Sequence, residues 1–195
     1  MHVANLSIVT PAQGAISWET MFLDAPLKGS SIYVGDPKPE IDDAWGDLVR
    51  YANTRVQAED LERINRTSVP LNDAEGGFLV NLNVFHHLHC LNKIRKQLYN
   101  DYYQDWHSPS AQLEHVNHCI EYLRQVVMCN ADITMQTFDW IDDYRRPWPN
   151  FKIQHECKNW DALTDWAKEH SVPSLIGPII THPVLGVSWR EDDIH

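Results

Sequence analysis

A five-residue pattern, His-x-x-His-Cys, occurs twice in this 195-residue chain, each time inside a segment with helical periodicity. The two copies supply four histidines and two cysteines: His86, His89 and Cys90 in the first, His115, His118 and Cys119 in the second. On a helix, positions i, i+3 and i+4 lie on one face, so each copy presents two imidazoles and one sulfur in the same direction. A fold that buries these groups must also give them partners, because burying an unpaired polar group is costly.

Two long helices are predicted around the two copies. The first spans about residues 80–103, with an apolar stripe that includes His87 as a packing residue: Val84, His87, Leu91, Ile94 and Leu98. The second begins with Ser108 as its N-cap and Pro109 in its first turn and ends near Cys129. Its expected core stripe is Leu113, Val116, Ile120, Leu123 and Val127. Packed face to face, the helices would bring four imidazoles into a partly buried seam, where helical bundles build metal sites.

The rest of the chain predicts shorter elements. Residues 39–51, 57–65 and 159–170 have the pattern of short helices, and residues 132–151 alternate as one or two short strands do. We therefore predict a mainly α fold, a compact helical domain built on the two packed long helices, with extended arms and short strands. The expected organisation is an N-terminal arm over 1–30, a main domain over 31–175 and an extended C-terminal tail over 176–195.

The charge balance excludes one class of partner. The net charge is −11, and no basic stripe is present to neutralise phosphates, so we expect no nucleic-acid partner. The short basic cluster NKIRKQ at 92–97 is interpreted as a solvated helix face. The chain has no run of eighteen apolar residues of the kind that spans a membrane.

The spacing of the histidines excludes several known kinds of metal site but does not identify the metal. The pattern is neither the H-E-x-x-H of zinc proteases nor the C-x-x-C-H of haem attachment, and no C-x-x-C pair supports a structural zinc site. Imidazole suits zinc, copper, iron and nickel alike. With cysteine as a ligand, zinc or a thiolate copper site is favoured; with the cysteines in disulfides, an all-histidine site suits copper and leaves positions open for dioxygen or substrate. The structural alternative is a core of hydrogen-bonded histidines.

The cysteines and two sequons point to an oxidising compartment. The even cysteine count, at Cys90, Cys119, Cys129 and Cys157, allows three two-bridge connectivities. We expect Cys90 and Cys119 to be disulfide-bonded, to each other or to Cys129 and Cys157, rather than to bind metal, because exposed thiolates beside a redox-active metal would be oxidised. Asn5 and Asn65 are the candidate glycosylation sites.

At these motifs the sequence resembles the UstYa family, fungal proteins of mycotoxin and cyclic-peptide biosynthesis. The family carries two H-x-x-H-C motifs, matched here by His86–Cys90 and His115–Cys119. Similar surroundings extend the resemblance over about residues 30–170: DDAW at 42–45, GGFLVNLNVFHHLHCLNKIRK at 76–96, HCIEYLRQVVMCNAD at 118–132 and HECKNWDALTDWAKEH at 155–170.

The resemblance implies a copper-dependent oxidase of secondary metabolism that cyclises, hydroxylates or chlorinates C–H bonds of a peptide or related natural product, with dioxygen. His86, His89, His115 and His118 would hold the metal, and His155 of the closing motif would be a further ligand. Independently of the resemblance, Tyr122 lies one turn beyond His118 and is a candidate to orient substrate or donate a proton; the alternative is a buried tyrosine with a satisfied hydroxyl. The alternatives are a non-redox cyclase or dehydratase with zinc, iron in place of copper, and a non-catalytic partner subunit; a homo-oligomer or a paired family member is the expected protein partner.

The resemblance also bears on location. Family members usually carry one N-terminal transmembrane helix that places the catalytic part in a lumen. We expect a secretory-pathway lumen if such an anchor has been trimmed from this sequence, and otherwise a soluble protein of undetermined compartment.

Overall fold

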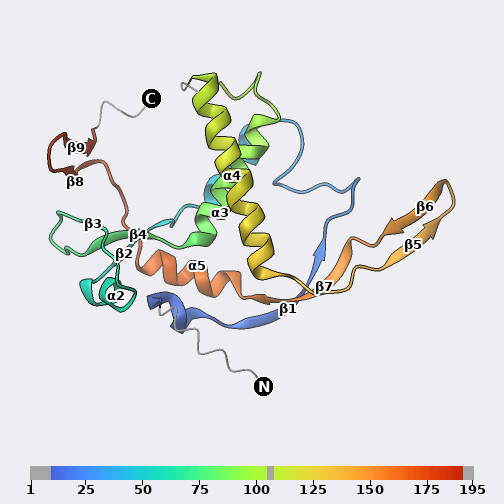
Figure 1. The fold of residues 1–195 in the computed structure, drawn as a ribbon, viewed down its shortest axis with the longest axis horizontal. Coiled ribbons are helices and arrows are strands. Elements are labelled where there is room, and N and C mark those ends of the chain that lie inside the picture. The colour runs from blue at the N-terminus through green and yellow to red at the C-terminus, as the bar shows by residue number, and fades with distance from the viewer. Residues whose placement is uncertain (1–9, 105–107, 191–195) are drawn as a thin grey trace. The chain divides into compact units, whose positions relative to one another are not determined.

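The computed structural model describes residues 10–104 and 108–190, and this part of the chain forms five α-helices and nine β-strands (Figure 1). The prediction of a mainly α fold is wrong, because the described residues are 38% helix and 25% strand, a mixed α/β fold with several small sheets. By its contacts the chain divides into two units, which are described separately.

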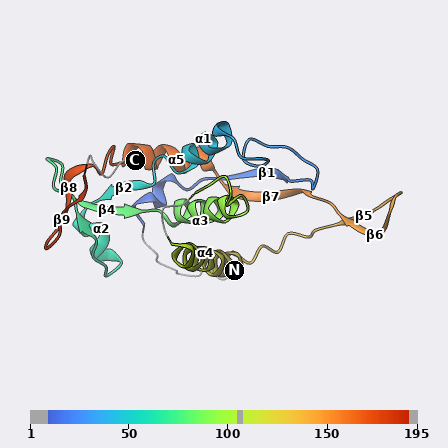
Figure 2. The same ribbon diagram turned by 90° about the horizontal axis from the view of Figure 1, so that it is seen from above.

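The first unit comprises Met1–Ser17, Arg50–Leu82 and Asn159–His195. Its three-stranded antiparallel sheet has the order β2 (Asn53–Val56), β4 (Phe78–Asn81), β3 (Val69–Pro70), and β2 and β4 lie side by side in Figure 2. Its other elements are η1 (Pro11–Ala15), α2 (Ala58–Arg63), α5 (Trp160–Glu169) and the hairpin of β8 (Gly177–His182) with β9 (Gly186–Trp189).

An aliphatic cluster forms the core of the first unit. Leu71, Val172 and Ile180 are each at most 5% exposed, and Leu79 and Ile179 pack against them. Residues of the expected extended tail form this hairpin, and β8 contributes Ile180 to the cluster.

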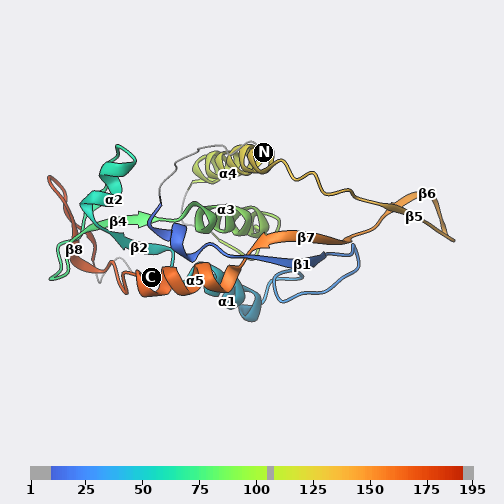
Figure 3. The same cartoon turned by 90° about the horizontal axis from the view of Figure 1, so that it is seen from below.

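The second unit comprises Trp18–Val49 and Asn83–Lys158. Its helices are α1 (Pro39–Leu48), α3 (Asn83–Gln97) and α4 (Pro109–Asn130). Two antiparallel ribbons complete it, visible in Figure 3: β1 (Trp18–Asp24) with β7 (Lys152–Lys158), and β5 (Phe138–Ile141) with β6 (Tyr144–Pro149). None of the helices in the described residues is both long and apolar enough to cross a membrane.

The helix boundaries follow local signals. At the start of α4 the Ser108 hydroxyl accepts a hydrogen bond from the Ala111 N–H at 3.3 Å, and Pro109 occupies the first turn, as predicted. The three predicted short helices are confirmed as α1, α2 and α5. The first long helix is shorter than predicted, because residues 78–81 pair as β4 and the helix ends at Gln97.

The predicted core stripes of the two long helices are wrong at five of their ten positions. Val116 is buried, but five of the expected core residues are 48–77% exposed: Leu91, Leu98, Leu113, Ile120 and Val127. The side chains buried on α3 and α4 are instead Phe85, Cys90, Val116 and Cys119. The helices therefore meet through the face that carries the His-Cys motifs, and much of the apolar stripe faces outward.

Candidate metal centre

The four motif histidines form a row between α3 and α4. The ring centroids of His86 and His118 are 5.7 Å apart, those of His89 and His115 are 5.6 Å apart, and those of His86 and His89 are 6.3 Å apart. An earlier residue of α3 thus lies opposite a later residue of α4, as in an antiparallel helix pair. The structure brings the four predicted ligands into one row, and two of them, His86 and His118, belong to the group whose ligand atoms lie closest together.

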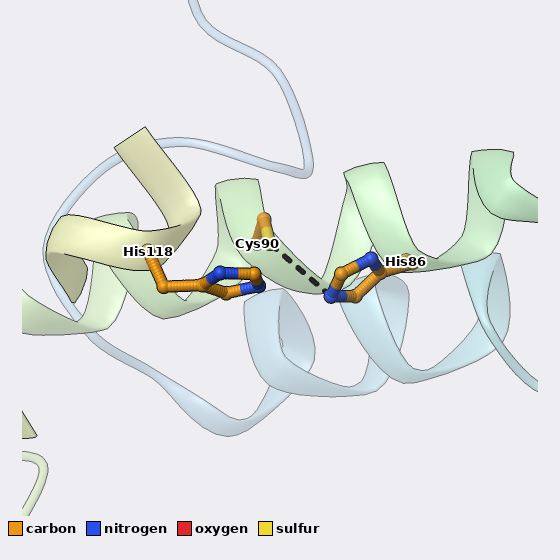
Figure 4. A group of neighbouring side chains, drawn as sticks. All are labelled: His86, Cys90 and His118. Carbon is orange, nitrogen blue, oxygen red and sulfur yellow. Dashed lines mark hydrogen bonds between the residues drawn. The ribbon is translucent and has the colours of Figure 1, made fainter. Parts of the chain in front are cut away.

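Three potential ligands are closest at one end of this row. Ligand atoms of His86, Cys90 and His118 all lie within 4.8 Å of one another. Figure 4 shows the His118 ring reaching from α4 toward His86 and Cys90 of α3, and the Cys90 Sγ lies 3.7 Å from Nε2 of His86. Cys90 is fully buried and His118 is exposed, so the cluster is open on the α4 side.

The environment favours the neutral forms of the imidazole and the thiol. Desolvation is the largest cause that lowers the pKa of His89, and the positive charges of His115, His86, Lys93 and Lys96 lower it further. Burial, with a hydrogen bond to Cys119 as the next cause, raises the pKa of Cys90 to about 12. Neutral imidazole is the form that binds a metal, whereas a protonated thiol is not.

All four cysteines are free thiols in this structure. Cys90 and Cys119 are both fully buried and hydrogen-bonded to each other, while Cys129 is exposed at the end of α4 and Cys157 is partly buried on β7. The disulfide stays a prediction, and the contact favours the pair Cys90–Cys119 among the possible connectivities.

Tyr122 lies at the His86–His118 end of the row. Its ring centroid is 4.8 Å from that of His86, and the ring is stacked on His118 at 5.9 Å with an interplanar angle of 10°. His87 contacts the other side of Tyr122 at 5.4 Å, and burial lowers its pKa. The proposed role of Tyr122 toward substrate stays a prediction, and its position beside two candidate ligands is compatible with it.

His155 is not part of the row. It lies on β7, where Nδ1 is 3.1 Å from the Ile153 carbonyl oxygen and Nε2 is 2.8 Å from the Asp132 carboxylate. Both ring nitrogens are therefore engaged by oxygen atoms of neighbouring groups, and the structure does not bring His155 to the other candidate ligands.

The candidate glycosylation sites differ in what the structure describes. Asn65 is exposed and has a left-handed backbone with φ of 50°, just after α2. Asn5 lies outside the described residues.

A polar network that sequence reasoning did not predict joins α1 to α3. Arg95 donates a hydrogen bond to Asp42 and another to the Tyr103 hydroxyl at 2.9 Å, and that hydroxyl donates to Asp42 at 3.0 Å. The guanidinium also lies over the Trp45 ring. Asp42 and Trp45 belong to the DDAW motif, and the Arg95 side chain is only 10% exposed, so interpreting residues 92–97 as one solvated face is wrong for Arg95.

The residues present fit a transition-metal ion. Up to four imidazole nitrogens and one sulfur stand on two facing helices, and imidazole binds copper, zinc and iron. The buried thiols of Cys90 and Cys119 interact with each other across the same two helices.

The fold and the site define a mixed α/β protein with a histidine-rich candidate metal centre between two helices. The model of the family described as mycotoxin biosynthesis protein UstYa matches residues 2–170, and the chain belongs to this family.

Named relatives are fungal oxidases. The chain is 30% identical over 189 residues to the UstYa family oxidase aprY of Aspergillus flavus, covering 80% of this chain and 57% of the relative. It is 34% identical over 162 residues to the UstYa family oxidase phomYc of Diaporthe leptostromiformis, covering 75% and 62%. The chain thus spans little more than half the length of these relatives. No solved structure matches the chain.

Proposed function

We propose that this chain is a metal-dependent oxidative tailoring enzyme that acts on C–H bonds of a peptide or related natural product, by cyclisation, hydroxylation or chlorination. The observation that carries the proposal is the row of four imidazoles, two from each motif, on facing helices. Relatives named as oxidases support the oxidative part. The sequence carries no glycine-rich dinucleotide fingerprint, so its redox centre must be of another kind.

Copper is the metal we propose, held by His86, His89, His115 and His118. The histidines offer the nitrogen donors that copper accepts. When bound, copper supplies the one-electron chemistry with dioxygen that amino-acid side chains lack. The exposed edges of His89 and His118 leave room for a substrate, and Tyr122 is positioned to orient it or to supply a proton.

A second candidate function rests on the sulfur of Cys90. Mixed nitrogen and sulfur donors, as in His86, Cys90 and His118, are typical of zinc. In that case the chain is a non-redox cyclase or dehydratase, in which the metal polarises the substrate. Turnover that persists without dioxygen and without copper distinguishes this function from oxidation.

The same proposal includes the partners and the location. A peptide natural product and dioxygen are the proposed reactants, and a second copy of the chain or a paired family member is the proposed protein partner. A secretory-pathway lumen is the proposed compartment, because copper chemistry and paired cysteines both suit an oxidising environment.

Copper loading of the full chain tests the proposal. We expect bound copper by elemental analysis and nitrogen coupling in the electron paramagnetic resonance spectrum. Replacing the two exposed histidines with alanine (H89A/H118A) should remove most of both signals without opening a cavity. The matched control is His182→Asn in the first unit, which keeps a side-chain acceptor for the Val184 and Leu185 N–H groups. Copper occupancy that is unchanged in H86A/H89A/H115A/H118A would sink the proposal.

A further inference from the structure

A cavity of about 460 Å³ opens at the far end of the histidine row from Tyr122. His89 and His115 form part of its wall, and Lys93, Lys96 and Tyr103 form another part. The remaining lining consists of five Asn and Gln side chains. This volume lies in the range of pockets that hold small ligands.

The charge of this cavity is opposite to that of the chain. The sequence has 27 acidic and 16 basic residues, yet the described residues that line the cavity include two lysines and no carboxylate. Both lysines act electrostatically on His89, where they lower its pKa after the larger effects of burial and the neighbouring histidines. Both lysines line the same cavity as His89 and His115, which places two positive charges at this end of the row of candidate ligands.

The cationic wall is also held in place. The Lys96 ammonium lies 5.0 Å from the centre of the Tyr103 ring, and the Tyr103 hydroxyl is fixed between Arg95 and Asp42. Asp42 is the carboxylate near this wall: Arg95 pairs with it and the Lys96 Nζ lies 4.0 Å from the same carboxylate, so two cations share one negative charge. The side chains around Lys96 are therefore already held in position when a second anion binds at Lys93 and Lys96.

We propose that this cavity binds a carboxylate of a peptide substrate through Lys93 and Lys96, so that the adjoining part of the peptide lies against His89 and His115. The amide side chains of the lining both donate and accept hydrogen bonds, as peptide groups do, which favours a peptide over a bare anion. The inference rests on the proposed function, because it assigns the substrate class of the same site.

Binding of short peptides to the metal-free full chain tests the inference. The probes are the acetylated tetrapeptide Gly-Phe-Val-Ala with a free C-terminus, its C-terminal amide, and the amide with Glu in place of Val. We expect a carboxylate-bearing probe to bind about tenfold or more tightly than the neutral amide. Ring signals of His89 and His115 should shift in nuclear magnetic resonance spectra on binding. The two acidic probes separate a terminal carboxylate from a side-chain carboxylate.

Charge-matched variants complete the design. K93Q/K96Q should bring the acidic probes to the affinity of the neutral amide, whereas K152Q/K158Q on β7 of the same unit, with the same change in net charge, should leave the preference intact. Equal binding of acidic and neutral probes, equal loss in both variants, or unmoved His89 and His115 signals would each overturn the inference.

The two proposals fail separately. Copper bound by the histidines together with no preference for a carboxylate would leave the proposed function standing and end this inference. Carboxylate-dependent binding in a chain that binds no copper would do the reverse.

Discussion

The two units differ in the kinds of side chain that pack between their elements. The first unit buries an aliphatic cluster of Leu71, Val172 and Ile180, which no chemistry beyond burial is needed to hold together. On α3 and α4 of the second unit the buried side chains are Phe85, Val116 and the cysteine pair, partly exposed histidines lie beside them, and leucines, an isoleucine and a valine of the same helices are exposed. The helix pair thus combines a small apolar contact with polar groups, and its stability should depend in part on what binds those groups.

The physical reason lies in the cost of burying polar groups. An apolar side chain gains free energy wherever it leaves water, but a partly buried imidazole or thiol gains only when a partner replaces the water it loses. A metal ion and a disulfide are two such partners, and at the candidate positions both would act on the second unit alone.

The largest effect should come from the aliphatic core. Leu71→Ala removes buried methyl groups from the first unit and should reduce the free energy of unfolding by about 2–5 kcal/mol. The matched control is Leu98→Ala just after α3, where the side chain is 77% exposed and the loss should be within about 0.5 kcal/mol. Urea unfolding of both variants measures the difference, and similar losses would contradict the assignment of the core.

The next effect concerns the cysteine pair. In protein from an oxidising host we expect a Cys90–Cys119 disulfide, and C90S/C119S should reduce stability by about 2–4 kcal/mol because the unfolded chain is released from the cross-link. Intact mass after denaturing alkylation, with and without reduction, and peptide mapping give the connectivity.

A control and a contrary result sharpen this test. Cys129→Ser changes an exposed thiol at the end of α4 and should leave the Cys90–Cys119 link unaffected. Four alkylatable thiols in unreduced protein would refute the disulfide, and the serine variants at 90 and 119 should then weaken metal affinity more than stability.

The sequence was sufficient for features that depend on neighbouring residues. Ser108 and Pro109 fix the start of α4 through one backbone hydrogen bond and a preset φ angle, and the i, i+3, i+4 spacing puts the ligands on one face. These signals need no information from elsewhere in the chain, so the position of α4 and the gathering of the histidines could be predicted.

Features that depend on distant partners could not be predicted. Strand β1 is exposed along its whole length and lacks alternation, and only its pairing with β7, more than a hundred residues later, makes it a strand. The apolar stripe marks Leu113 and Val127 as hydrophobic but does not say which face of α4 meets α3. The partner of Arg95, Asp42, lies 53 residues away, so the basic cluster gave no sign of that contact.

Metal binding should increase the difference in local stability between the two units. Copper at about 100 times its dissociation constant should add about 2.7 kcal/mol of protection to amides of α3 and α4, because the ion binds the folded helix pair and not the unfolded one. Hydrogen exchange of the full chain with and without copper measures this. Amides of β2 and β4 should change little, and H89A/H118A should lose the gain. An equal gain in both units would show that the metal acts elsewhere or on the whole chain.

The smallest expected effect is the difference in stability contributed by one ion pair from each unit. In the first unit the Asp73 carboxylate accepts from Arg55, whose side chain is 10% exposed, and this bond is the main cause that lowers the pKa of Asp73 below 3.8. In the second unit Arg124 lowers the pKa of Glu121 to about 2, but both side chains are more than half exposed. Solvent screens an exposed pair strongly, so the two should differ in stability although their geometry is similar.

The stability that the Asp73 carboxylate contributes depends on pH. A carboxylate whose folded pKa is depressed stabilises the protein above its unfolded pKa, and this stability is lost as the pH falls through the folded pKa. Asp73→Asn should therefore lower the melting temperature at pH 7, and the difference from the unchanged protein should vanish as the pH falls from about 4 through the lowered pKa. Glu121→Gln should change the melting temperature little at any pH, because its partner is solvated. A difference for Asp73→Asn that persists at the acid end would mean that the hydrogen bond which Asp73 accepts from the Gly76 N–H, rather than its charge, supports the turn.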